Sequence, residues 1–205
     1  GISISSDNSY ALIADGSNNQ IRKITISTQE VSLFAGSSST SGSTNGVGSN
    51  AKFYNPFGIS ISFDGSYALI CDGWNHMIRQ ITISTQQVTL LSGGFGSSNG
   101  VGSNAQFYNP TGVDISSDGS FALVADQSNN QIRKIQILTP PTSTPTITPT
   151  LTPTQSPTVP LPLLPVITFA GSTTGTTNGV GSNAKFNGPY GIDISSDGYF
   201  SLIAE

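Results

Sequence analysis

The sequence has few charged residues, and this shortage limits the partners that it suits. Only 9% of its 205 residues are charged, and lysine and arginine together number seven. An average globular domain has roughly 25% charged residues. A basic face that follows a phosphate backbone is therefore not expected, so we predict no nucleic-acid partner and set aside an RNA-binding module.

Cysteine, histidine and long apolar runs are scarce as well. The single cysteine, Cys71, excludes an internal disulfide framework, and the single histidine, His76, leaves no second imidazole for a zinc site. No apolar run reaches the length of about 18 residues that a membrane span needs. Cys71 stands where the other repeats have alanine and is predicted to be small and buried, whereas His76 is predicted to be a turn residue. No cofactor is expected.

What the sequence does contain is a long internal repeat. The segment Gly-Ile-Ser-Ile-Ser-Ser-Asp at residues 1–7 recurs in closely similar form at 58–64, 112–118 and 191–197. Within one unit, short apolar stretches at 59–62, 67–71, 78–84 and 88–91 are separated by turn residues such as Asp-Gly. No stretch shows a helical period. Four short strands in each repeat are typical of a β-propeller blade.

A glycine-rich connection follows each fourth strand. Its first copy reads Thr-Asn-Gly-Val-Gly-Ser-Asn-Ala-Lys-Phe at residues 44–53, and the same pattern returns at 98–107 and 177–186. Together with Pro-x-Gly-Ile, Asp-Gly-Ser and Asn75-His76-Met77, this order resembles the NHL repeat family. The resemblance covers everything except a proline- and threonine-rich tract. It implies an all-β propeller of four-stranded antiparallel blades, and it implies no particular chemistry.

The repeat divides the chain into about three and a half blades. The first blade and its connection take residues 1–57, the second 58–111, the third 112–190, and half of a fourth 191–205. Propellers have about four to eight blades. We therefore expect a fragment of a larger ring whose remaining blades lie in the full-length chain, or a ring that two chains complete together. The exposed end edges predict an isolated chain that associates.

The proline- and threonine-rich tract at 139–165 interrupts the third blade between its third and fourth strands. Proline recurs there at every fourth position, at residues 145, 149, 153 and 157. Such a segment buries little apolar surface and is expected to be extended, disordered and sensitive to proteases. It is interpreted as a tolerated insert or as an O-glycosylated spacer. We expect an extracellular or cell-surface location and leave a cytoplasmic one open.

Polar residues that recur in every blade are predicted to brace turns. An aspartate ends each second strand and an arginine begins each third strand, and both suit charge-assisted hydrogen bonds with backbone groups. A catalytic group is usually needed only once, so we expect structural roles for these residues: Asp15, Asp72, Asp126, Arg22, Arg79 and Arg133.

Residues that occur in only one repeat are better candidates for a site. Trp74 replaces the serines of the sister turns, and an aromatic residue on a loop suits a partner contact. In an antiparallel blade, successive connections alternate between the two faces. The turn of Trp74 therefore shares a face with the long connections, which carry Tyr54, Phe95 and Tyr108. Asp114 and Asp193, on the innermost strands, are weak candidates for a cation site.

These features predict a non-enzymatic binding scaffold that presents its loops to a protein, peptide or glycan partner. The alternative is a propeller enzyme that resembles lactonases or peptide-amidating lyases. Such an enzyme would gather metal ligands from several inner strands, some of them in blades outside this sequence. The function prediction leans away from catalysis because the repeated residues have structural explanations and this segment offers only Asp114 and Asp193 as ligands.

Overall fold

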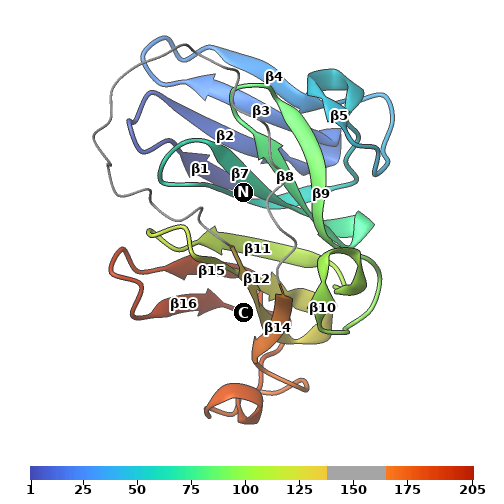
Figure 1. The fold of residues 1–205 in the computed structure, drawn as a ribbon, viewed down its shortest axis with the longest axis vertical. Coiled ribbons are helices and arrows are strands. Elements are labelled where there is room, and N and C mark those ends of the chain that lie inside the picture. Colours follow the sequence, from blue (N-terminus) through green and yellow to red (C-terminus); the bar gives the residue numbers. More distant parts are fainter. Residues whose placement is uncertain (138–164) are drawn as a thin grey trace, which may run out of the picture.

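The computed structural model describes residues 1–137 and 165–205, and these form four antiparallel sheets arranged one after another along the chain (Figure 1). The all-β propeller fold predicted from the repeats is confirmed. Six short 3₁₀ turns interrupt the strands, and the described residues contain no helix that is long and apolar enough to cross a membrane. The predicted insert at 139–165 lies outside the described residues except for Pro165.

The first two sheets are complete blades. The first has strand order β1-β2-β3-β4, and the second has the order β5-β9-β8-β7-β6. The strands of the first are β1 (Ile2–Ile4), β2 (Tyr10–Asp15), β3 (Gln20–Thr25) and β4 (Val31–Gly36). Those of the second are β5 (Gly46–Val47), β6 (Pro56–Ile61), β7 (Tyr67–Asp72), β8 (Met77–Thr82) and β9 (Gln87–Gly93).

The third sheet repeats the second, and the fourth contains two strands. The third has the order β10-β14-β13-β12-β11. Its strands are β10 (Gly100–Val101), β11 (Pro110–Ile115), β12 (Phe121–Asp126), β13 (Gln131–Gln136) and β14 (Pro165–Ala170), and the fourth sheet pairs β15 (Gly191–Ile194) with β16 (Ser201–Ala204). The 3₁₀ turns are η1 (Gly16–Asn18), η2 (Gly48–Asn50), η3 (Gly73–Asn75), η4 (Gly102–Asn104), η5 (Gln127–Asn129) and η6 (Gly181–Asn183).

The connections contribute a fifth strand that the four-strand pattern did not predict. After blade 1, the chain crosses to the outer edge of blade 2, where β5 pairs with β9 through Gly46 and Val88. β10 pairs with β14 of blade 3 in the same way. The chain then passes through a 3₁₀ turn to the inner strand. Through β5 and β10, these two connections therefore pair with the outer strand of the blade that follows each of them.

The hydrophobic core lies between blades. Leu12 and Ile21 of blade 1 pack with Ile59 and Ile70 of blade 2 and with Phe53 of the connection. The same arrangement recurs between blades 2 and 3 and between blade 3 and the last sheet. At the two ends of the row, by contrast, Ile2 and Leu202 are exposed, although their counterparts Ile59 and Leu69 are buried. Contact with a neighbouring blade is what buries these positions.

The inner strands of successive blades are joined by side-chain acceptors. The N–H of Ile61 donates to Ser3 Oγ at 3.0 Å, and that of Ile115 donates to Ser60 Oγ at 3.2 Å. In the third repeat, Asp114 Oδ2 accepts from the N–H of Ile194 at 2.7 Å. Ser, Ser and Asp thus occupy one position of the repeat and perform one task.

A glycine near the start of the inner strands β6 and β11 permits this close approach. A Cβ atom on Gly58 would lie 2.5 Å from the carbonyl oxygen of Thr111 and 2.9 Å from the nitrogen of Val113, both backbone atoms of the next blade. A Cβ atom on Gly112 would lie 2.8 Å from the carbonyl oxygen of Tyr190. Any side chain at this position would force neighbouring blades apart.

We predict that Gly58→Ala lowers the free energy of unfolding by about 1–3 kcal/mol, the usual cost of overpacking. The control is Gly94→Ala, because a Cβ atom there would meet nothing within 4 Å, and surface changes usually stay within about 0.5 kcal/mol. Urea unfolding of both variants measures the difference. Equal losses would contradict the proposed close approach of the inner strands.

Candidate binding face

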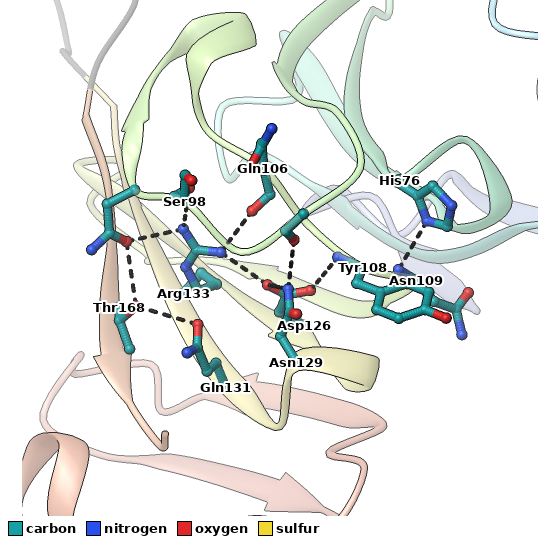
Figure 2. A network of polar contacts seen from close by, with 12 residues as sticks. His76, Ser98, Gln106, Tyr108, Asn109, Asp126, Asn129, Gln131, Arg133 and Thr168 are labelled. Carbon is teal, nitrogen blue, oxygen red and sulfur yellow. Dashed lines mark hydrogen bonds and ion pairs between the residues drawn. The ribbon is translucent and has the colours of Figure 1, made fainter. Parts of the chain in front are cut away.

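In blade 3, a buried ion pair lies beneath the β12–β13 turn and the long connection, on the face of the blades that carries both. Arg133 Nη1 lies 2.9 Å from Asp126 Oδ2, and both side chains are fully buried (Figure 2). The guanidinium also donates to the backbone carbonyls of Ser98 and Gln106, at 3.0 and 2.8 Å. The other carboxylate oxygen of Asp126 accepts the N–H of Tyr108 at 2.8 Å. The pair thereby ties the β12–β13 turn of blade 3 to the connection that precedes the blade.

Blade 2 has the same network. Arg79 Nη1 lies 2.9 Å from Asp72 Oδ2, and Asp72 Oδ1 accepts the N–H of Tyr54 at 2.8 Å. The side-chain amide of Asn75 donates both to Asp72 and to the carbonyl of Gly42 in the connection. These contacts hold the β7–β8 turn and the long connection together on one face, which is the arrangement expected from the alternation of connections.

The pair in blade 1 is looser. Arg22 lies 3.7 Å from Asp15, and the two side chains are 38% and 23% exposed. Among the described residues, no connection precedes this blade to supply carbonyl acceptors. Within the 205 residues of the sequence, the pair in blade 1 therefore gives a comparison for the two pairs that a connection covers.

The last residue of each turn links its blade to the next connection. His76 adopts a left-handed conformation with φ of 59°, and its Nδ1 accepts the N–H of Asn109 at 3.1 Å (Figure 2). In the sister turns, Asn19 Oδ1 accepts the N–H of Asn55 and Asn130 Oδ1 accepts that of Gly188. An acceptor is therefore needed at this position, and neutral histidine or asparagine can provide it.

Five rings gather on this face, and we call them the aromatic patch: Tyr54, Trp74, His76, Phe95 and Tyr108. Tyr54 and Trp74 meet edge to face with centroids 4.9 Å apart. Phe95 contacts Tyr108 at 5.0 Å and His76 at 5.2 Å. Phe95 is 64% exposed and Trp74 52% exposed. The structure therefore places the four contact candidates from the sequence in two groups of contacting rings, Tyr54 with Trp74 and Phe95 with Tyr108, and adds His76 to the second group.

Three of these rings have no counterpart in the other repeats, whereas Tyr54 and Tyr108 occupy the same position of successive connections. Trp74 corresponds to Ser17 and Ser128, and His76 corresponds to Asn19 and Asn130. The backbone bonds Gly42–Phe53, Gly96–Phe107 and Gly175–Phe186 align the connections, so that Phe95 corresponds to Ser41 and Thr174. Trp74, His76 and Phe95 are therefore local departures from the repeat, in the turn of blade 2 and in the connection between blades 2 and 3.

The inner-strand aspartates are placed differently. Asp114 accepts the hydroxyl of Ser60 on Oδ1 and the N–H of Ile194 on Oδ2, so each carboxylate oxygen has a protein donor. It borders a hollow of about 260 Å³ that is lined largely by serines of the four inner strands and of the turns that follow them. Asp193 is exposed. Residues 1–137 and 165–205 contain no cluster of three or more side chains suited to a metal ion.

Burial shifts several pKa values in these elements. It disfavours the charged form and raises the pKa of Asp72 and of Asp126, against which the arginine and amide donors act. It lowers the pKa of His76, which favours the neutral ring that accepts from Asn109. Burial also raises the pKa of the Cys71 thiol, and Cys71 is inaccessible, as predicted.

Comparison with known proteins relates this chain to repeat propellers. No family model matches. The chain is 27% identical over 150 residues to NHL repeat-containing protein 2 of Bos taurus, and the match covers 68% of the chain and 21% of that protein. The chain thus spans about a fifth of that relative's length. The resemblance to NHL repeats is confirmed.

Solved structures agree on the fold. A protein of unknown function from Bacteroides thetaiotaomicron matches with a TM-score of 0.68 and 19% identity, over 100% of this chain and 44% of that one. An auxiliary nutrient binding protein from the same organism matches with a TM-score of 0.56 and 24% identity, over 65% of this chain and 36% of that one. At these identities the matches show the fold alone.

We predict that His76 makes stability depend on pH. Its pKa is lowered in the folded chain, so the unfolded chain takes up a proton first as pH falls below about 6.5. The contribution of neutral His76 to the free energy of unfolding is complete above that pH and is lost as pH falls toward 5. His76→Asn keeps an acceptor that does not titrate. The measurement is the free energy of unfolding of both proteins between pH 7 and pH 5. Parallel profiles would contradict the role given to Nδ1.

Proposed function

We propose that this chain, a row of NHL-type β-propeller blades, is a non-enzymatic binding scaffold that presents the aromatic patch to a partner. The observation that carries the proposal is the exposure of Trp74 and Phe95, two rings at positions where the repeat departs from its sisters. Residues common to all blades are engaged in strand, turn and connection contacts. Trp74 and Phe95, by contrast, have large exposed surfaces that the fold does not need, because serine or threonine serves at the same positions.

The patch has the features of an interaction surface. Exposed aromatic side chains supply a large share of the binding energy at interfaces, and they do so best when the scaffold holds them rigidly. Here the backbone of Tyr54 and Tyr108 is anchored on the buried carboxylates of Asp72 and Asp126. The rings therefore need little ordering when a partner binds. An extracellular or cell-surface location fits such a role and is part of the proposal.

The enzymatic alternative has less support from the described residues. It requires several metal ligands on inner strands, and Asp114 is already engaged by Ser60 and Ile194. Metal-dependent turnover of a lactone or of an amidated-peptide precursor by the complete protein would favour that alternative over the binding scaffold.

Replacing Trp74 by serine tests the proposal, because serine is the residue of both sister turns. In the complete protein, we expect Trp74→Ser to raise the dissociation constant for its protein, peptide or glycan partner at least tenfold. A loss of this size is in keeping with losses at interface hot spots. The melting temperature should stay unchanged. The matched control is Ser17→Ala in the same turn of blade 1, which should leave binding intact. Partners that bind equally well to Trp74→Ser, Tyr54→Asn and Tyr108→Asn would refute the face assignment.

A further inference from the structure

We infer that the ligand of the aromatic patch is a neutral oligosaccharide. The inference rests on the proposed function and narrows it to one chemical class. Three observations lead to it: the inclined, partly exposed rings, the loss of charge beside Phe95 and Tyr108, and the amide side chains near them.

The rings offer flat apolar surfaces in more than one direction. Tyr54 and Trp74 are inclined at 85°, and Phe95 and Tyr108 at 69°, so neighbouring rings do not cover one another face to face. The C–H groups on one side of a pyranose ring form an apolar face of similar size. Stacking buries that face, while the hydroxyl groups at the edge of the sugar stay free to make hydrogen bonds.

The connection that carries Phe95 and Tyr108 has lost the charge found in its sisters. Gln106 stands where the other connections have Lys52 and Lys185. The Gln106 amide lies against Gly96, next to Phe95 in the chain, because a Cβ atom on Gly96 would collide with it. Among the described residues, the cation–π contacts involve Tyr10, Phe53, Phe107 and Phe121 and none of the patch rings. A neutral ligand can cover Phe95 and Tyr108 without desolvating the lysine that the sister connections carry.

Amide side chains complete the surroundings. Asn109, beside Tyr108, donates its amide to Gln127 Oε1 at 2.6 Å, and Gln127 replaces the glycines Gly16 and Gly73 of the sister turns. An amide both donates and accepts hydrogen bonds, and so does a sugar hydroxyl. Two glutamines, Gln106 and Gln127, thus replace the residues of the sister repeats near Phe95 and Tyr108.

Peptide recognition modes fit the surface less well. Acidic or phosphorylated peptides need accessible arginines, and Arg79 and Arg133 are fully buried in their ion pairs. Strand addition needs an open sheet edge, whereas the patch lies on turns and connections. A proline-rich peptide on aromatic rings is the remaining peptide mode, and the experiment includes it as an arm.

Trp74 is the only tryptophan of the chain, so intrinsic fluorescence reports directly from the patch. The probes are neutral hexasaccharides of glucose, mannose, galactose and xylose in α and β linkage. We expect at least one of them to produce a saturable change in the intensity or wavelength of the emission. Phe95→Thr and Gln106→Lys restore residues of the sister repeats and keep the reporter, and each should raise the dissociation constant at least tenfold. Ser17→Ala is the control that should not change it.

The outcomes separate this inference from the proposed function. If no hexasaccharide changes the emission, the oligosaccharide assignment is wrong. If a synthetic peptide with the sequence of residues 140–164 changes it instead, the ligand class is wrong and the binding face stands. If a hexasaccharide binds but Phe95→Thr and Gln106→Lys leave its affinity unchanged, the sugar lies elsewhere and the assignment to the patch falls.

Discussion

The buried pair of aspartate and arginine is the interaction on which the rest of the structure depends. In blades 2 and 3, Arg79 and Arg133 use both terminal nitrogens on a carboxylate and on carbonyls of the preceding connection. A charge buried without a partner would cost several kcal/mol, so the connection has to follow a path that brings its carbonyls to the guanidinium. That path carries the chain to the outer edge of the next blade and back to its inner strand. The long glycine-rich connection therefore belongs to the packed structure of the blade.

Because a few residues of each repeat hold the blade and its connection together, other positions are free to change. The brace needs the aspartate, the arginine and an asparagine in the turn, and the link between blades needs an acceptor at the position of His76. Trp74 lies in the turn between residues that form the brace, and Phe95 lies in the connection; neither position is needed for the brace or for the link between blades. Trp74 and Phe95 could therefore replace small polar residues without loss of the scaffold. The same braces then hold the backbone beneath the rings in place.

The strands and the shared face of turns and connections could be predicted because they depend on local patterns. Alternating residues such as those around Ile59, and turn residues such as Asp64 and Gly65, specify their own neighbourhood. The fifth strand could not be predicted, since Gly46-Val47 is too short to show a period and its partner Val88 lies far along the chain. Asp114 reads as a free polar residue until Ile194 is placed beside it. The meeting of His76 with Phe95 likewise depends on side-chain packing across two elements, which no spacing reveals.

The central claim is that burial by the connection, and not the ion pair alone, makes the brace strong. Urea unfolding of Arg133→Met and Arg22→Met in the 205-residue polypeptide tests it most directly, because within these residues the first pair is covered by a connection and the second is not. Arg133→Met leaves Asp126 buried without its cation and should lower the free energy of unfolding by about 3–5 kcal/mol. Arg22→Met should cost less than about 1 kcal/mol, as exposed pairs do. Equal losses in the two variants would contradict the claim.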